Sequence, residues 1–290
     1  MGGVSGAFLL LPFQVSILGF TSPSVSPTNL VYNIVAIPSG VYRYIREARM
    51  AWPLAWVIIG GTLPGVFIGA VVRIKYLPDP GSFKVFAGCV LLYIGGRLFY
   101  GLSVRGGPKN QKTRALEERF QIRPYKAGGA AESTDNPQGI IQTLNFSLTS
   151  YAYSFLGETF SFNTLALFVL TFLVGIVGGT YGIGGGAIIA PFLVTFFGLP
   201  IYTIAGAALL GTFITSIAGV VFYTLIAPYF AHTGLAIAPD WLLGALFGAG
   251  GFLGMYCGAR LQKYMPAKII KIILAVSITF LAVKYLANVF

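Results

Sequence analysis

Apolar residues occur along this chain in long runs that short polar or charged stretches separate. Most runs have the roughly 17–25 residues that a helix needs to cross the hydrocarbon layer of a membrane. The first and the sixth are shorter and are expected to be half-helices or re-entrant segments. The nine segments cover residues 4–18, 25–44, 52–72, 83–100, 165–177, 183–197, 202–226, 241–258 and 268–288. The pattern predicts an all-α polytopic membrane protein.

One stretch inside these runs, residues 177–192, is unusually rich in glycine. It holds six glycines, and no charged side chain occurs anywhere in residues 165–198. Each glycine weakens a helix by ~1 kcal/mol relative to alanine, so the cluster predicts a break between two helical pieces. Broken backbone at membrane depth is tolerated only where it is buried in protein or lines a cavity. The stretch is therefore a candidate binding site.

The same pattern occurs at the start of the chain. A shift of 179 aligns residues 3–44 with 182–223 without a gap, and a shift of 189 aligns 52–70 with 241–259. The matched pairs include Gly3/Gly182, Gly6/Gly185, Pro12/Pro191, Trp52/Trp241 and Gly61/Gly250. We interpret this as two copies of one unit of about four helices, each with a discontinuous glycine-rich helix. Residues 165–177 have no counterpart in the first copy.

Glycines also recur every four residues in two of the longer segments. They are Gly61, Gly65 and Gly69 in the third segment, and Gly250, Gly254 and Gly258 in the eighth. Small residues at this spacing share one helix face and let a second helix approach closely. We expect both faces to serve helix packing.

Between the two copies, residues 103–163 are much more polar and are expected to form a small soluble insert. Its last part alternates large apolar residues with small polar ones, as in Leu144, Phe146 and Leu148 and in Tyr151, Tyr153 and Phe155. A period of two predicts short β-strands in a hairpin or meander near the membrane surface. The expected domains are a first transmembrane repeat (1–102), the insert (103–163) and a second repeat (164–290).

The charge balance supports this class. Charged residues are 9% and apolar residues 56% of the chain, whereas soluble domains carry about 25% charge. The net charge of +11 comes largely from loops, which favours topology signals and contacts with membrane lipids over nucleic-acid binding. Cys89 and Cys257 lie far apart in apolar segments, so we expect small packing residues and no metal site or cofactor.

Positive charge also predicts orientation. The loop after the second segment, the insert and residues 259–268 are basic and are expected to be cytoplasmic, whereas residues 227–240 contain no Lys or Arg. Five segments separate each pair of equivalent segments, so the two copies should run in opposite directions, as an inverted repeat. Arg73 and Lys75 are the exception, because this tracing places them on the outer side.

Together these residues resemble the TauE/SafE family of sulfite and organosulfonate permeases. The resemblance rests on Gly182-Ile-Gly-Gly-Gly186 leading to Pro-Phe, on its echo Gly3-Val-Ser-Gly6, and on the small-polar helix entry that follows. It covers residues 2–100 and 165–290. It implies an integral protein of the bacterial cytoplasmic membrane that moves a small sulfur-containing oxoanion.

The chain departs from that family at one place. The family usually has Thr-Ser near the start of the second helix of the second repeat, where this chain has Ala207 and Ala208. The first repeat keeps Thr28 and Asn29 at the corresponding positions. The polar side of a shared site would therefore come mainly from the first repeat.

A helix start presents unpaired N–H groups and about half a positive charge, which suits a small anion. We expect the two glycine breaks to converge on such an anion, with nearby polar side chains adding hydrogen bonds. The candidate substrate-binding residues are Gly3, Ser5, Gly6, Asn29, Asn33, Tyr181, Gly182, Gly184, Gly185, Gly186 and Thr212. In the alternative reading, the glycines only allow close helix crossing, and Asn29 and Asn33 only fix packing.

The predicted spans contain no Asp, Glu or His, the usual members of a proton relay. A divalent anion leaving an inside-negative cell gains about twice the ~2.3 kcal/mol per 100 mV of a single charge. These points favour electrogenic anion export. Arg97 and Lys284 occupy nearly matching places near the ends of their spans and are expected to reach the lipid headgroups.

Other classes fit less well. A membrane-embedded enzyme would need a nucleophile and base or a metal cluster, which one loop histidine and acid-free spans do not offer. A cation channel or importer would need carboxylates or soft ligands. The match of residues 182–187 to a dinucleotide fingerprint has no preceding strand and no acid about 20 residues on. The sequence leaves a homodimer open.

Overall fold

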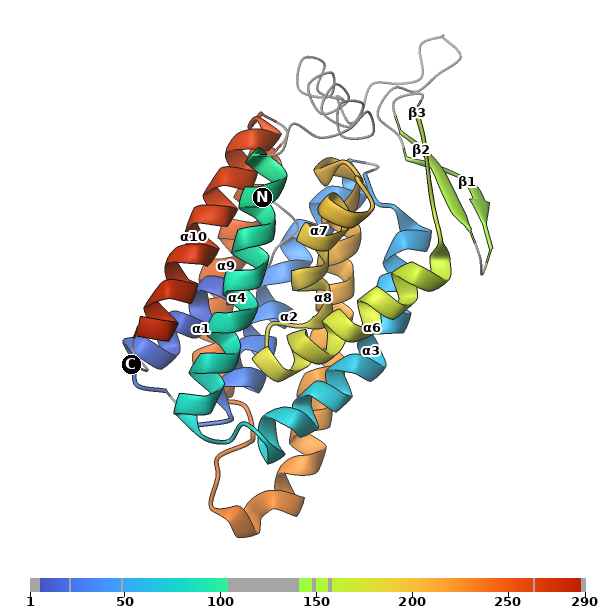
Figure 1. The fold of residues 1–290 in the computed structure, drawn as a ribbon. Helices are drawn as coiled ribbons and strands as arrows, with labels where there is room; N and C mark the ends of the chain where they lie inside the picture. The colour runs from blue at the N-terminus through green and yellow to red at the C-terminus, as the bar shows by residue number, and fades with distance from the viewer. Residues whose placement is uncertain are drawn as a thin grey trace.

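The computed structural model describes residues 6–20, 22–47, 49–103, 141–147, 150–155, 158–262 and 264–287. Within them, a helix lies at each of the nine predicted apolar segments, and the bounds differ by a few residues (Figure 1). The helices are α1 (Ala7–Ser16), α2 (Val25–Arg46), α3 (Trp52–Lys75), α4 (Pro80–Ser103), α6 (Thr164–Tyr181), α7 (Gly185–Phe196), α8 (Ile201–Ile226), α9 (Trp241–Gln262) and α10 (Ala267–Ala287). A 3₁₀ helix, η1 (Ala227–Thr233), follows α8.

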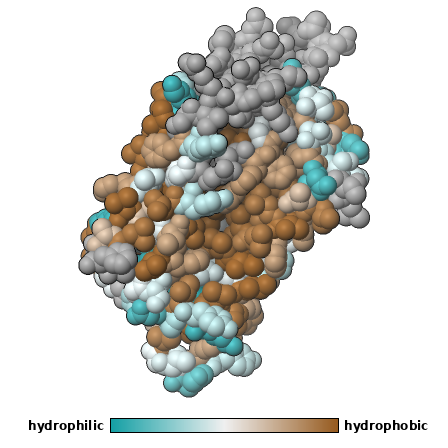
Figure 2. All heavy atoms as spheres, viewed as in Figure 1, coloured by the Kyte–Doolittle hydropathy of each residue, from teal (hydrophilic) through white to brown (hydrophobic). Residues whose placement is uncertain are grey.

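The surface is that of a membrane protein. Among the described residues, four helices are long and apolar enough to cross a bilayer: Trp52–Lys75, Thr164–Tyr181, Ile201–Thr233 and Trp241–Leu261. Shorter apolar helices cover Pro80–Gly96, Gly185–Val194 and Ala275–Ala287. Figure 2 shows hydrophobic residues around the middle of the molecule and hydrophilic residues gathered at its lower end. The predicted class is confirmed.

Helix α2 has the lowest apolar content of the long helices and buries several polar side chains. Ser26, Thr28, Asn29, Asn33 and Ser39 all lie inside the protein. The helix packs against α1, α8 and α9, which cover it on several sides. Polar groups in a membrane are stable where protein rather than lipid surrounds them, so the least apolar helix occupies the interior.

Among the described helices, α3 and α6 form the most closely packed pair. A Cβ on Gly65 would lie 2.8 Å from the amide nitrogen of Ile176, and one on Gly69 would lie 2.6 Å from that of Thr180. Conversely, a Cβ on Gly175 would lie 2.7 Å from the carbonyl oxygen of Thr62. The contacts advance together along both chains, so α3 and α6 run parallel. The packing role predicted for the third-segment glycines is confirmed.

The matching glycines of α9 have a different environment. A Cβ on Gly250 or Gly254 would meet no heavy atom within 4 Å among the residues that the structure describes. Helix α6, which precedes α7 in the chain, packs on the glycine face of α3. No described helix packs in the same way on the glycine face of α9. The glycine faces of α3 and α9 therefore differ in their packing among the described residues.

The predicted strands form a three-stranded antiparallel meander, as Figure 1 shows beside the helices. The strands are β1 (Gln142–Phe146), β2 (Tyr151–Phe155) and β3 (Glu158–Phe162). Tyr153 on β2 is buried, and its hydroxyl is 3.0 Å from Oγ1 of Thr203 at the start of α8. Burial raises the pKa of Tyr153. The sheet thus packs on the helices through β2. Leu148, which was also part of the predicted strand pattern, lies outside the described residues.

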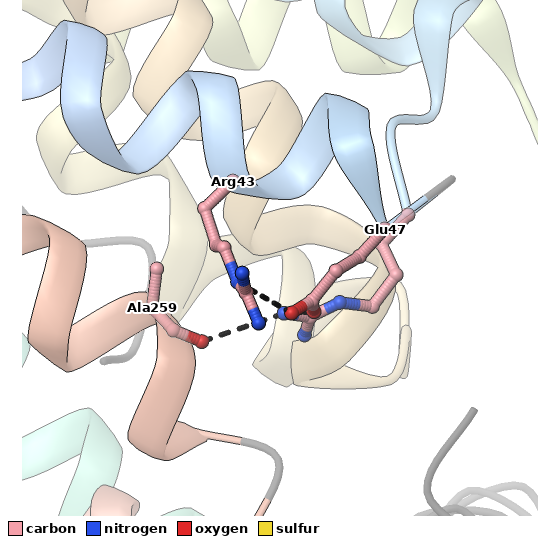
Figure 3. A network of polar contacts seen from close by, with 4 residues as sticks. Arg43, Glu47 and Ala259 are labelled. Carbon is pink, nitrogen blue, oxygen red and sulfur yellow. Dashed lines mark hydrogen bonds and ion pairs between the residues drawn. The ribbon is translucent and has the colours of Figure 1, made fainter. Parts of the chain in front are cut away.

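Charged residues at the end of α2 and in the basic loop that follows it form a network of ion pairs (Figure 3). Glu47 Oε1 lies 2.6 Å from Arg43 Nε, and Glu47 Oε2 lies 2.5 Å from Arg49 Nη2. Arg49 is buried and also donates to the carbonyl oxygen of Ala259 on α9 at 3.4 Å. Two of the three arginines that predict a cytoplasmic loop therefore also fasten α2 to α9.

Candidate functional site

The chain turns between α6 and α7 at Gly182–Gly184. Gly182 and Gly184 have φ angles of 82° and 79°, a left-handed conformation that glycine adopts without a steric cost. Helix α6 therefore ends at Tyr181 and α7 begins at Gly185. The two helices contact each other beside the turn, where a Cβ on Gly178 would lie 2.7 Å from the carbonyl oxygen of Gly184.

Side chains from α2 and α8 hold this turn on two sides. Asn33 Nδ2 donates to the carbonyl oxygen of Ile183 at 3.0 Å and to Ser216 Oγ at 3.2 Å. The amide of Gly185 donates to Thr215 Oγ1 at 3.2 Å. The turn thus joins α2 and α8 through buried hydrogen bonds.

Several amides of the turn are already engaged by the protein. Gly182 and Ile183 donate to the carbonyl oxygen of Gly178 at 2.9 and 3.1 Å. The glycines also allow close crossings, since a Cβ on Gly182 would lie 2.5 Å from Cβ of Ser26 and one on Gly186 would lie 2.6 Å from the amide of Thr212. These contacts are those of the packing alternative, and the role of the bare amides in anion binding stays a prediction.

The polar face of α2 lies along the turn. Ser26, Asn29 and Asn33 are spaced three and four residues apart, so they share one helix face. Ser26 abuts Gly182 and Asn33 bonds to Ile183, which places Asn29 between them. Asn29 is fully buried, and neither its Nδ2 nor its Oδ1 has a hydrogen-bond partner among the described residues. No described protein group therefore uses the hydrogen-bonding capacity of the Asn29 side chain.

The remaining predicted site residues lie in different surroundings. Tyr181 is fully buried, its hydroxyl has no hydrogen-bond partner in the described part of the chain, and its ring centroid is 6.1 Å from that of Phe8 on α1. This contact brings the start of α1, where Gly6 lies against the ring of Tyr32, near the end of α6. Thr212 Oγ1 donates to its own helix at Ala208. Gly3 and Ser5 lie outside the described residues.

The sequence reasoning missed Arg73, which it placed on the outer side as an exception. Arg73 is fully buried, its guanidinium carbon lies 3.9 Å from the ring centroid of Phe83, and its Nη1 donates to the carbonyl oxygen of Leu77. The ring of Phe83 is in turn 6.1 Å from that of Tyr181. One signal could have found it: Arg73 continues the four-residue spacing of the α3 glycines.

The described residues hold no group of three or more His, Cys, Asp or Glu that could bind a metal ion. What they offer near the turn is an amide, hydroxyls and one guanidinium, a set rich in hydrogen-bond donors. A helical membrane protein with such a buried polar site beside a broken helix has the build of a membrane transporter.

Comparison with known proteins agrees with this class. The model of the family described as "Sulfite exporter TauE/SafE" matches residues 1–285. The chain belongs to the TauE/SafE family of membrane transporters. It is 23% identical over 205 residues to a protein of Bacillus subtilis (strain 168) named "Probable membrane transporter protein YunE". That match covers 68% of this chain and 63% of the relative, less than two thirds of its length. No solved structure matches the chain significantly.

Proposed function

We propose that the protein exports a small sulfur-containing oxoanion, sulfite or an organosulfonate, across the bacterial cytoplasmic membrane at the turn between α6 and α7. The observation that carries this proposal is the buried, unpartnered amide of Asn29 beside that turn. Leaving a buried polar group unsatisfied costs about 1–3 kcal/mol, and native proteins rarely do so. A ligand that accepts from Asn29 Nδ2 would remove part of this cost.

The path would run between two inverted repeats, formed by α1–α4 and α7–α10. In support, the helix contacts come in reciprocal pairs. Helix α2 packs on α9 as α3 packs on α8, and α1 meets α10 as α4 meets α7. Substrate sites of such transporters lie where the repeats meet. The domain boundaries proposed from the sequence, at residues 102/103 and 163/164, are consistent with this arrangement.

The membrane potential would drive export. The nine described α-helices contain no Asp, Glu or His, so within them no side chain of the usual proton relays is present. Each negative charge that leaves an inside-negative cell gains about 2.3 kcal/mol per 100 mV. No coupled ion is needed for a process with this gain.

Proteoliposomes test the proposal directly. They would be loaded with radiolabelled sulfite, and efflux would be measured under potassium diffusion potentials of either sign. We expect efflux to rise when the interior is negative and to remain unchanged by a pH gradient alone. Protein-free liposomes and an Asn29→Leu variant are the controls, and both should show slower efflux. Flux that does not change with the membrane potential and that requires a pH gradient would contradict the mechanism. The absence of any oxoanion flux would contradict the substrate class.

A further inference from the structure

Arg73 is a buried cation without a carboxylate partner. Its side chain is fully buried, and the ion pairs found among the described residues join only Arg43, Glu47 and Arg49. Asp79, the acid that affects it electrostatically, is exposed and accepts a hydrogen bond from the amide of Ser82 at 2.9 Å. A buried charge is costly unless it is paired and hydrogen-bonded. Among the described residues, Arg73 therefore lacks the carboxylate partner that a buried guanidinium is expected to have.

The part of Arg73 that is free has a specific geometry. Nη1 donates to the carbonyl oxygen of Leu77, whereas Nε and Nη2 have no hydrogen-bond partner in the part of the chain that the structure describes. Nε and Nη2 lie on the same edge of the planar guanidinium, and their N–H groups point the same way. This edge is the fork that binds two oxygens of a carboxylate, phosphate or similar oxoanion at once.

Arg73 also lies at the level of the turn between α6 and α7. Gly65 faces Ile176 and Gly69 faces Thr180, so the next turn of parallel α3 brings residue 73 alongside the end of α6. Phe83 connects the two places, because its ring contacts both the Arg73 guanidinium and the Tyr181 ring.

We propose that the Nε–Nη2 edge of Arg73 is the charged contact for the transported oxoanion, which it binds through two oxygens. This inference rests on the proposed function, which by itself supplies only neutral donors. It assigns the substrate class more narrowly, to anions with at least two oxygens on one centre. A halide can meet both N–H groups only through its single atom, so it lacks the two-oxygen match to the fork and should bind more weakly.

Purified protein in detergent provides the test, with equilibrium binding of radiolabelled sulfite as the measurement. Arg73→Met removes the charge, and Arg73→Lys keeps the charge but removes the planar fork. Lys75→Met is the matched control, because Lys75 is exposed two residues further along the same helix. We expect both Arg73 variants to bind sulfite about tenfold or more weakly and Lys75→Met to bind like the wild type. An unlabelled sulfonate should compete in the wild type, and chloride at the same concentration should not.

The outcomes separate this inference from the proposed function. Wild-type protein that binds no sulfur oxoanion would overturn both. If the wild type, Arg73→Lys and Arg73→Met all bind sulfite equally well, only the inference about Arg73 is overturned. Arg73 would then serve as a cap for the end of α3. Should Arg73→Met fail to fold, the binding of Arg73→Lys decides between these two results.

Discussion

Asn33 of α2 donates a hydrogen bond of 3.0 Å to the carbonyl oxygen of Ile183, which lies 150 residues further along the chain. The bond joins α2 to the turn between α6 and α7. Asn29, one turn earlier on the same face, is equally buried but has no hydrogen-bond partner among the described residues. Asn33 therefore holds the turn, whereas contact with a ligand is the role proposed for Asn29.

Substitution of each asparagine by leucine, which has a similar volume, should separate these roles. Asn33→Leu leaves the Ile183 carbonyl without this donor, at a cost of about 1–3 kcal/mol, so we expect a lower Tm in detergent. Asn29→Leu removes a polar group without a protein partner, so its Tm should equal or exceed that of the wild type. Sulfite binding should fall in Asn29→Leu. Equal losses of Tm in the two variants would contradict the distinction.

The sequence predicted those features of the fold that a local pattern encodes. Runs of apolar residues predicted the helices, and the glycine cluster of residues 177–192 predicted a break between two helical pieces, which lies between α6 and α7. The alternation around Tyr153 predicted the strands. Asn29 and Asn33 were selected as polar residues in an apolar segment, and the structure places both beside the turn. Local signals sufficed here because each feature depends on residues close together in the chain.

Features set by distant residues could not be predicted in this way. Arg49 is buried because it meets Ala259, 210 residues away, and nothing around Arg49 in the sequence indicates that contact. For the same reason, the charge pattern predicts only that Arg73 lies on the outer side of the membrane, and it does not indicate the burial of Arg73 against Phe83 of α4. The open face of α9 depends on which helices pack there, which the glycine spacing does not specify.

The glycines of α3 and α9 allow a matched pair of substitutions, because Gly65 and Gly254 occupy matching positions when the two sequence segments are aligned. A Cβ on Gly65 would lie 2.8 Å from the backbone of Ile176, whereas one on Gly254 would meet no described heavy atom within 4 Å. Gly65→Ala should therefore separate α3 from α6 and cost about 1–3 kcal/mol. Gly254→Ala should be neutral or stabilising by up to ~1 kcal/mol, because alanine favours a helix.

Thermal unfolding in detergent measures both changes, and size-exclusion chromatography should accompany it. A lowered Tm in Gly254→Ala, together with a change in elution volume, would show that this face of α9 packs against another protein segment. That result would contradict the neutral outcome expected for Gly254. It would not affect the expectation for Gly65, which depends only on α6.

The ion network at the end of α2 should be a point of stability rather than of transport. Glu47→Gln leaves Arg49, which is buried, and Arg43 without their shared carboxylate (Figure 3). Loss of one partner of a buried ion pair typically costs about 3–5 kcal/mol, so the Tm should fall strongly. Arg46→Gln, at an exposed position of the same turn, should change the free energy of unfolding by no more than about 0.5 kcal/mol. A Glu47→Gln variant as stable as Arg46→Gln would show that the network is not needed for folding.

The contact between the sheet and the helices predicts a dependence on alkaline pH. Tyr153 is buried on β2 beside Thr203, and burial raises its pKa above the ordinary value near 10. Because the folded protein holds this proton more tightly than the unfolded chain, the contact contributes fully below about pH 10 and weakens as the pH rises further. Tyr153→Phe cannot ionise, and it loses one buried hydrogen bond worth about 1 kcal/mol.

The Tm of the wild type and of Tyr153→Phe should therefore be compared at pH 8 and at pH 11. At pH 8 the variant should be slightly less stable, since only the hydrogen bond is missing. At pH 11 the difference should shrink or reverse, because the wild type alone must keep Tyr153 protonated to remain folded. Burial also raises the pKa of Tyr151, so some alkaline destabilisation should remain in the variant. A gap that widens between pH 8 and pH 11 would show that Tyr153 is not buried against α8.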